Sequence, residues 1–215
     1  MAHRVLTIAG LKGGIAKTAT ATNLAAWWSG QGKRVLVVDA DPNGSATKAY
    51  QRGDGQLLLL SDSSCVPIQQ APMAMSKPWD LVVVDTAGGS RDEQSQYAEG
   101  SDFVLCPCQP AASSIEQVID LAELISATGK SFGIALTMCD ARRSVDARKA
   151  REVLERIGLP VLSSQIALLS AWPKAEASGV AVRDARTDAN RPDPNAAKAW
   201  EQVGALAVEI ESKLN

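Results

Sequence analysis

Continuous apolar runs alternate with amphipathic stretches along almost the whole chain. The runs are short, contain many β-branched residues, and span 4–9, 34–41, 80–89, 102–107 and 132–138. Such runs are typical of strands that are buried on both faces, as in parallel sheets. We therefore predict five buried strands, together with a sixth, shorter strand near residues 65–68.

The segments between the runs have apolar residues at helical spacing. This spacing predicts helices near residues 17–30, 44–52, 111–128, 144–157 and 194–213. In the fourth of these helices the expected core stripe comprises Ala150, Val153, Leu154 and Ile157. Alternating strands and helices predict an α/β fold, with a doubly wound and mainly parallel sheet flanked by helices.

Two segments lack a regular pattern. Residues 53–79 are expected to form a loop around the short strand, and the polar, proline-containing stretch 186–196 is expected to be a surface loop. The chain shows no internal repeat, low-complexity tail or interdomain linker. We expect one domain that spans residues 1–215.

A glycine-rich segment, GLKGGIAKT at residues 10–18, separates the first run from the first helix. A strand that ends in such a turn before a helix gathers backbone N–H groups and the positive end of the helix dipole, which favours anion binding. Lys17 and Thr18 stand where a phosphate-binding ammonium and a Mg²⁺-binding hydroxyl are needed. Ala16 replaces the last glycine of the motif, at a cost of about 1–2 kcal/mol if the position requires positive φ. The alternative is an ordinary glycine-rich turn without a ligand.

Three carboxylates follow apolar strands: Asp39 and Asp41 after the second, and Asp85 after the third. A carboxylate in this position is costly unless it is solvated, paired or near a cation. All three are expected at the sheet edge that carries the glycine-rich loop, so a shared Mg²⁺–nucleotide site explains them together. Capping of the next turn is the alternative for any single aspartate.

Composition excludes several classes of protein. The net charge of −2 argues against a wholly basic nucleic-acid protein but permits a local basic patch. No apolar run approaches the roughly 20 residues of a membrane span, and the first residues do not resemble a signal peptide. We therefore expect a cytoplasmic protein. Cys106 and Cys108 share one face of a predicted strand, but two thiols without a partner pair make a poor metal site.

Five segments together resemble the ParA family of partition ATPases, in the wider ParA/MinD group of deviant Walker A proteins. KGGIAKT (12–18) is similar to the family's K-G-G-x-G-K-T, whose first lysine defines the deviant motif. VLVVDADPNGSAT (35–47) resembles the D-x-D-P-Q-G-N segment, and DLVVVDTAGG (80–89) resembles the second switch. ALTMCDARRS (135–144) and AEASGVAVRD (175–184) resemble the stretches that approach the nucleotide base. Because the first strand begins near residue 4, we expect the short type of ParA, without an N-terminal helix-turn-helix.

Three positions depart from the family pattern. Ala16 replaces the last loop glycine, which bears on nucleotide affinity. Asn43 replaces the usual glutamine, and Ala87 stands where proline is common after Asp85. These last two departures bear on the kinetics of the switches.

The resemblance implies ATP and Mg²⁺ as cofactors, ATP-dependent dimerisation, and slow hydrolysis of ATP to ADP and phosphate that a partner stimulates. It assigns nucleotide binding to Lys12, Gly13, Gly14, Ile15, Ala16, Lys17, Thr18 and Ala19. Lys17 would contact the β- and γ-phosphates, while Lys12 would reach the partner subunit's phosphates and act in catalysis. Asp39 would orient the attacking water. Thr18, Asp41 and Asp85 would support the metal.

Nonspecific DNA binding is the second activity that the resemblance implies, with association with the nucleoid and a ParB-like or adaptor protein as partner. The candidate residues are Arg142, Arg143, Arg148, Lys149, Arg151, Arg183, Arg186 and Arg191. Arg148 and Arg151 lie about one helical turn apart and are expected on an exposed face. Acidic residues are interspersed among them, so a solvated helix face explains the pattern equally well.

We therefore expect an ATPase that segregates plasmid or chromosome cargo. A relative that positions a protein cargo, such as a carboxysome, is the closest alternative. A MinD-like membrane ATPase is less favoured, because the final helix carries three glutamates and one lysine at 199–215. An iron–sulfur carrier or an amidoligase finds little support in the sequence, and a non-enzymatic binding module remains an alternative if Ala16 abolishes nucleotide binding.

Overall fold

A seven-stranded sheet forms the centre of the structure, a computed structural model that describes residues 3–59 and 62–214. The strands are β1 (Arg4–Ile8), β2 (Val35–Ala40), β3 (Ser64–Pro67), β4 (Leu81–Thr86), β5 (Phe103–Cys108), β6 (Phe132–Cys139) and β7 (Val161–Ala167). Their order in the sheet is β3-β2-β4-β1-β5-β6-β7, and each pair of these described strands is parallel. The predicted doubly wound parallel sheet is confirmed.

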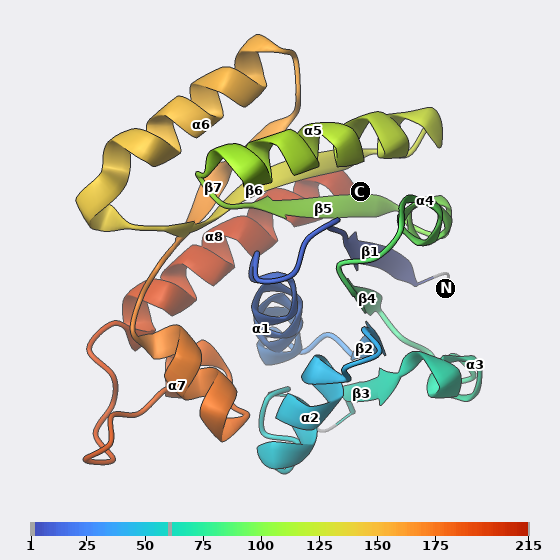
Figure 1. Cartoon of the computed structure of the whole chain (residues 1–215). Helices are drawn as coiled ribbons and strands as arrows, with labels where there is room; N and C mark the ends of the chain where they lie inside the picture. Colours follow the sequence, from blue (N-terminus) through green and yellow to red (C-terminus); the bar gives the residue numbers. More distant parts are fainter. Residues whose placement is uncertain (1–2, 60–61, 215) are drawn as a thin grey trace.

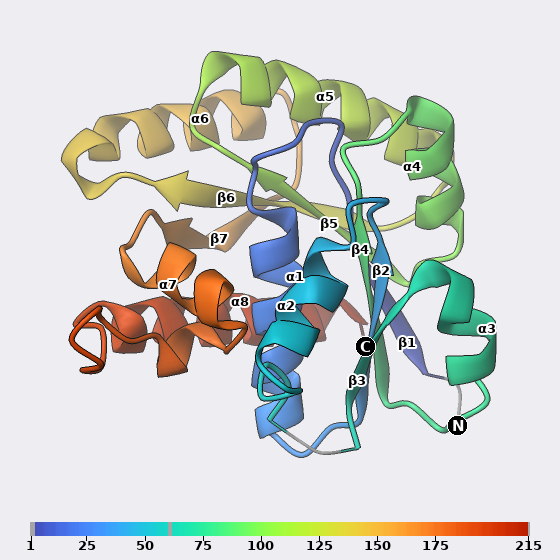
Figure 2. The same cartoon turned by 60° about the horizontal axis from the view of Figure 1, so that its bottom comes forward.

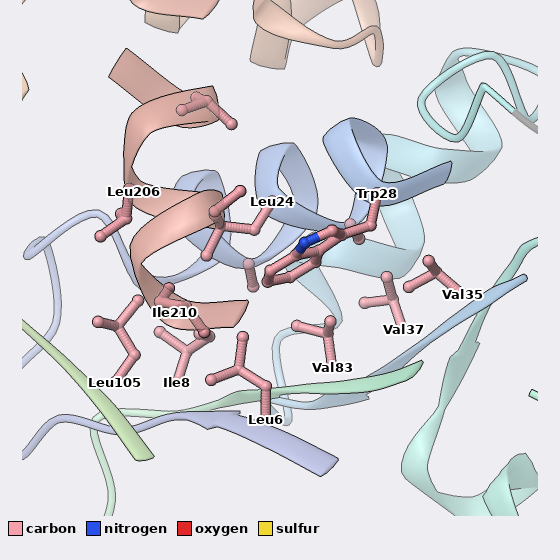
Figure 3. Packing of buried hydrophobic residues seen from close by; sticks show 14 of the residues in the cluster. Leu6, Ile8, Leu24, Trp28, Val35, Val37, Val83, Leu105, Leu206 and Ile210 are labelled. Atoms are coloured by element: carbon pink, nitrogen blue, oxygen red, sulfur yellow. The ribbon is translucent and has the colours of Figure 1, made fainter. Parts of the chain in front are cut away.

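Helices cover both faces of the sheet (Figures 1 and 2). One face carries α1 (Lys17–Gly30), α2 (Ser45–Arg52), α7 (Ala171–Ser178) and α8 (Ala196–Leu214). The other carries α3 (Ala71–Ala74), α4 (Arg91–Glu99), α5 (Ala112–Ala127) and α6 (Ser144–Arg156). Short 3₁₀ turns lie at Ile68–Gln70, Ala141–Arg143 and Val182–Asp184. Helix α1 packs beside α8 on this face, and both helices contact the strands directly (Figure 3).

The main core fills the space between the sheet, α1 and α8 (Figure 3). Alternate residues of each strand point to the same face, so Val35 and Val37 of β2 and Val83 of β4 all reach this core. Trp28 of α1 meets them and is fully buried. The same alternation directs the next residues in each series, Asp39 and Asp85, toward the beginning of α1.

Besides the short α3, three elements were not predicted. Helix α4 begins with a capping box between Ser90 and Glu93, a local signal that the sequence does contain. Strand β7 lies at the edge of the sheet, and Ser163, Ser164 and Gln165 interrupt its apolar pattern. Helix α7 is short and contains Pro173, and its sequence shows no clear helical period.

Some predicted details differ from the structure. Ile157, expected in the core stripe of α6, is 51% exposed because the helix ends at Arg156. Residues 53–79 contain β3 and the short α3 besides loop, and residues 60–61 of this segment lie outside the described residues. In the predicted surface loop 186–196, Asp193 is buried. A single domain over residues 1–215 stays a prediction.

Candidate functional site

A cavity of about 850 Å³ opens beyond the carboxyl ends of the strands. One part of its wall, here called the loop wall, is formed by Gly13, Gly14, Ala16, Lys17, Thr18 and Ala19. A second part, the α7 wall, is formed by Met138, Leu168, Trp172, Pro173, Glu176 and Val180. Thr22 and Asn23 of α1 and Asp41 after β2 also line the cavity. A pocket at this edge of an open α/β sheet is where ligands bind in such folds.

The backbone of the loop wall requires left-handed residues. Gly14 has φ 77°, and Ala16, which directly precedes α1, has φ 65° and ψ 27°. The sequence motif therefore places alanine where the backbone favours glycine, at a cost of about 1–2 kcal/mol. Thr20 N donates to Ala16 O (2.9 Å), which is the first backbone hydrogen bond of the helix.

Lys17 and Lys12 have different environments. Lys17 is buried, and its Nζ donates to the carbonyl oxygen of Lys12 (2.7 Å). Burial lowers the pKa of Lys17, while Asp85 and Asp41 act in the opposite direction. Lys12 is exposed, and its Nζ donates to Ser113 Oγ (3.3 Å) on α5. Lys17 belongs to the described lining of the cavity, whereas Lys12 does not.

Asp39 organises the turn that follows β2. Its Oδ1 accepts a hydrogen bond from Asp41 N (3.2 Å) and its Oδ2 accepts one from Thr47 N (2.7 Å). Asp41 in turn accepts a hydrogen bond from Asn43 N (2.8 Å). Asp39 is 2% exposed and stands opposite Asp85 in the β2–β4 register. The sequence prediction that these carboxylates share one sheet edge is confirmed.

Asp85 is fully buried, and neither of its carboxylate oxygens accepts a hydrogen bond of ordinary geometry from a described residue, although the Thr18 side chain lies close enough to lower its pKa. Burial raises the pKa of Asp85 to about 7; Asp39 and Asp41 add to this shift, whereas Thr18 and Lys17 oppose it. A buried carboxylate without a donor is costly. A divalent cation near Thr18 would supply the missing partner, so these residues fit Mg²⁺.

The described residues contain no group of three or more His, Cys, Asp or Glu side chains placed to hold a metal on their own. Mg²⁺ does not need such a group, because it usually keeps several waters and binds through one or two carboxylates plus phosphate oxygens. All four cysteines are free and buried.

Gln94 of α4 connects Gly10, at the start of the glycine-rich segment, to the end of β4 and the residue after it. Its Oε1 accepts from Gly10 N (3.2 Å) and Thr86 Oγ1 (3.3 Å), and its Nε2 donates to Ala87 O (3.2 Å). A Cβ at Gly88 would lie 2.8 Å from Gly13 N, so these two loops pack backbone against backbone. Sequence reasoning missed Gln94, since no local pattern distinguishes it from a surface glutamine.

The α7 wall is mainly apolar. Trp172 is half-buried, and its Nε1 donates to Ala167 O (3.0 Å), which fixes the edge of the indole. Leu168 and Met138 contribute further apolar surface to the cavity. An aromatic and aliphatic surface beside a phosphate-binding loop can take the flat ring of a nucleobase. Sequence reasoning missed Trp172 but identified two flanking segments, 135–144 and 175–184.

The candidate arginines of α6 and of the 3₁₀ turn before it have acidic or backbone partners. Arg142 pairs with Asp140 (2.7 Å), Arg143 with Asp146 (2.8 Å) and Arg148 with Glu152 (3.7 Å); Lys149 is exposed. Arg151 donates to Leu162 O (2.7 Å) and Ser163 O (3.2 Å), and its side chain is 23% exposed. The expectation that Arg151 shares an exposed face with Arg148 is wrong, because Arg151 turns toward β7.

The other basic candidates lie around α8. The Arg183 guanidinium stacks over the Trp200 ring, 5.6 Å from its centroid, and Arg186 donates to Asn190 O (3.0 Å). Arg191 is exposed. No helix in the described part of the chain has the length and apolar character that crossing a membrane requires.

Comparison with known proteins adds three relatives to this geometry. The sequence profile of the CobQ/CobB/MinD/ParA nucleotide binding domain matches residues 6–182. The chain is 30% identical over 181 residues to the maintenance of carboxysome distribution protein A of Gloeobacter kilaueensis, with 83% of each chain covered. It is 27% identical over 209 residues to the chromosome-partitioning ATPase Soj of Thermus thermophilus, covering 78% of this chain and 84% of Soj. The fold resembles the septum site-determining protein MinD of Pyrococcus horikoshii complexed with Mg-ADP, with a TM-score of 0.70, 15% identity and 98% and 96% coverage.

Proposed function

The chain belongs to the CobQ/CobB/MinD/ParA nucleotide-binding family, and on this premise we propose that it is an ATPase that binds Mg-ATP in the described cavity and dimerises when ATP is bound. The supporting observation is the arrangement beneath the loop wall. Lys17 and the donor-free carboxylate of Asp85 lie beside a left-handed loop that leads into α1. A triphosphate would meet the ammonium and the helix N-terminus, and Mg²⁺ would meet Asp85 and Thr18.

In this proposal the eight loop residues from Lys12 to Ala19 bind the nucleotide, and Asp41 supports the metal with Thr18 and Asp85. Asp39 orients the attacking water, while its own carboxylate is fixed by two backbone N–H groups. Lys12 reaches across the dimer to the partner's phosphates. Hydrolysis would then depend on assembly, because phosphoryl transfer needs positive charge where the phosphate oxygens gain negative charge.

We further propose that the ATP dimer binds DNA without sequence preference and segregates plasmid or chromosome cargo with a ParB-like partner. Of the basic candidates on α6, Arg148 and Lys149 are the better contacts because both are exposed, whereas Arg151 is held against β7. The similarity to a carboxysome distribution protein favours a second candidate, in which the cargo is a protein assembly.

Calorimetry and sedimentation test the first part of the proposal. The wild type should bind Mg-ATP, and an Asp39→Ala variant with ATP should sediment as a dimer. Lys12→Ala should still bind ATP but remain monomeric and lose hydrolysis; Lys48→Ala, at an exposed lysine of α2, is the matched control. Absence of ATP binding at millimolar nucleotide, or a monomer under dimer-forming conditions, would contradict the proposal.

Gel retardation of random duplex DNA tests the second part. With ATP, the wild type should retard DNA, and binding should weaken steeply with salt through counterion release. Arg148→Ala should reduce the salt slope by about one if it contacts a phosphate, whereas Arg156→Ala, at the exposed end of the same helix, serves as comparison. No retardation at low salt would favour the protein-surface ATPase over the DNA carrier.

A further inference from the structure

Behind the α7 wall lies an ion pair between the buried Asp193 and the half-buried Lys174, which the nucleotide site does not use directly. Lys174 Nζ stands 2.7 Å from Asp193 Oδ2, and the Asp193 side chain is 0% exposed. Asp193 Oδ1 also accepts from Ser170 Oγ (3.2 Å) and from Asn195 N (2.9 Å). Asn195 Nδ2 donates to Ser170 Oγ (2.9 Å), which completes a closed polar network.

This network joins two elements. Ser170 and Lys174 lie one helical turn apart at the beginning of α7, and Asp193 and Asn195 lie just before α8. Trp172, Pro173 and Glu176 come from the same helix and line the cavity. Side chains at the start of α7 therefore contact the segment just before α8, while Trp172, Pro173 and Glu176 line the space where the nucleotide would lie.

Forming this polar network costs free energy, and apolar residues in the same place would fold without that cost. Burying a carboxylate is unfavourable, and a buried ion pair is often no more stabilising than apolar residues of the same volume. The Asp193 end of the pair is nevertheless held in place, because the same carboxylate accepts hydrogen bonds from Ser170 Oγ and Asn195 N, so the contact ties the start of α7 to the segment before α8. In a helix of only 8 residues, this contact fixes the position of the residues around it.

We propose that Lys174 and Asp193 are positioning residues that hold α7 so that Trp172 and Pro173 contact the nucleoside part of the bound nucleotide. The inference rests on the proposed function, since it needs a nucleotide in the cavity. In this proposal, the Lys174–Asp193 ion pair supports binding of the base, and the loop wall binds the phosphates.

The test compares two ligands, Mg-ATP and inorganic Mg-tripolyphosphate, which lacks the nucleoside. Lys174→Met should weaken Mg-ATP about tenfold, equivalent to about 1.4 kcal/mol, while it leaves tripolyphosphate within about twofold. Lys174→Arg, which can still pair with Asp193, should restore most of the ATP affinity. The matched control is Lys33→Met, which removes the Lys33–Glu211 ion pair (2.5 Å) of α8 away from the cavity.

If Lys174→Met does not fold, the double variant Lys174→Met, Asp193→Asn removes the unpaired charge as well and is measured in the same way. Equal weakening of both ligands, or weakening of neither, overturns the positioning role. A wild type that binds ATP no more tightly than tripolyphosphate overturns it too, but leaves the proposed function intact. If the wild type binds neither ligand, both the positioning role and the proposed function are wrong.

Discussion

The two walls of the cavity are built in different ways. The loop wall comes from consecutive residues, 13–19, held between β1 and α1, which both lie in the main core. The α7 wall combines residues from β6, β7 and α7, and its position depends on contacts with α2 and α8. Figure 1 shows α7 beside α1 and α2, at the end of α8. A phosphate can thus be recognised by a local motif, whereas the surface for a base requires long-range packing.

The largest difference between the walls should appear when Lys17 is changed. Lys17→Ala removes the buried ammonium of the loop wall, so Mg-ATP binding should weaken by about 100-fold or more, since charge-assisted contacts to phosphate are among the strongest. Titration calorimetry measures this, with exposed Lys48→Ala as control. An effect no greater than that of Lys174→Met would mean that the two walls contribute equally.

This difference explains what the sequence could predict. Six of the seven strands, helices α1, α2, α5, α6 and α8, and the loop wall follow from local patterns: apolar runs, helical spacing and a glycine-rich motif before a helix. Asp39 and Asp85 could be placed because parallel strands end at one edge. The roles of three other residues could not be predicted: Trp172, Lys174 and Asp193. These roles depend on partners about 20 residues away or on other strands, and no local pattern encodes such partners. Asp193 even lies in a stretch whose composition is typical of an exposed loop.

The contact between α2 and α7 should be the weak point of the α7 wall. A Cβ at Gly53 would lie 1.8 Å from Gly179 O, and the backbone atoms there cannot give way cheaply. Gly53→Ala should destabilise the protein by about 3 kcal/mol and lower Tm by roughly 6–12 °C. It should also weaken Mg-ATP more than tripolyphosphate.

Gly100→Ala is the matched control for Gly53→Ala, because a Cβ at Gly100 meets its nearest neighbour at 3.7 Å, an ordinary contact. Thermal unfolding of the wild type, Gly53→Ala and Gly100→Ala measures the differences in Tm. Equal melting temperatures for Gly53→Ala and the wild type would show that α2 and α7 separate easily, and the α7 wall would then not depend on this contact.

The pKa of Asp85 gives a prediction for the pH dependence of stability beside the loop wall. Its pKa is raised to about 7, so the folded state binds an additional proton between the ordinary carboxyl pKa and about 7. The free energy of unfolding that depends on Asp85 therefore falls as pH rises through this window and stays lower above it. Asp85→Asn should remove this loss, stabilising the metal-free protein by up to about 4 kcal/mol near pH 8 and changing little near pH 4.

Denaturant unfolding in the presence of a chelator measures this pH dependence. The same variant should lose the stabilisation that Mg-ATP gives the wild type, because the metal has lost a carboxylate. A variant that is less stable than the wild type at both pH values would mean that Asp85 has a donor in solution, and the argument for a cation at this position would fail.

Ala16 should have the smallest effect, and it tests whether the loop wall is as well formed as its sequence suggests. Ala16 has φ 65°, so Ala16→Gly relieves a strain of about 1–2 kcal/mol, but glycine also loses about 0.4–1 kcal/mol through the greater entropy of the unfolded chain. The net gain should be at most about 1 kcal/mol, or roughly 2–4 °C in Tm. Gly14→Ala, at φ 77°, is the reverse control and should destabilise by a similar amount. If the glycine variant were instead less stable than the wild type, the strain at Ala16 would be smaller than the entropy that glycine loses, and the alanine in the motif would fit this loop better than glycine.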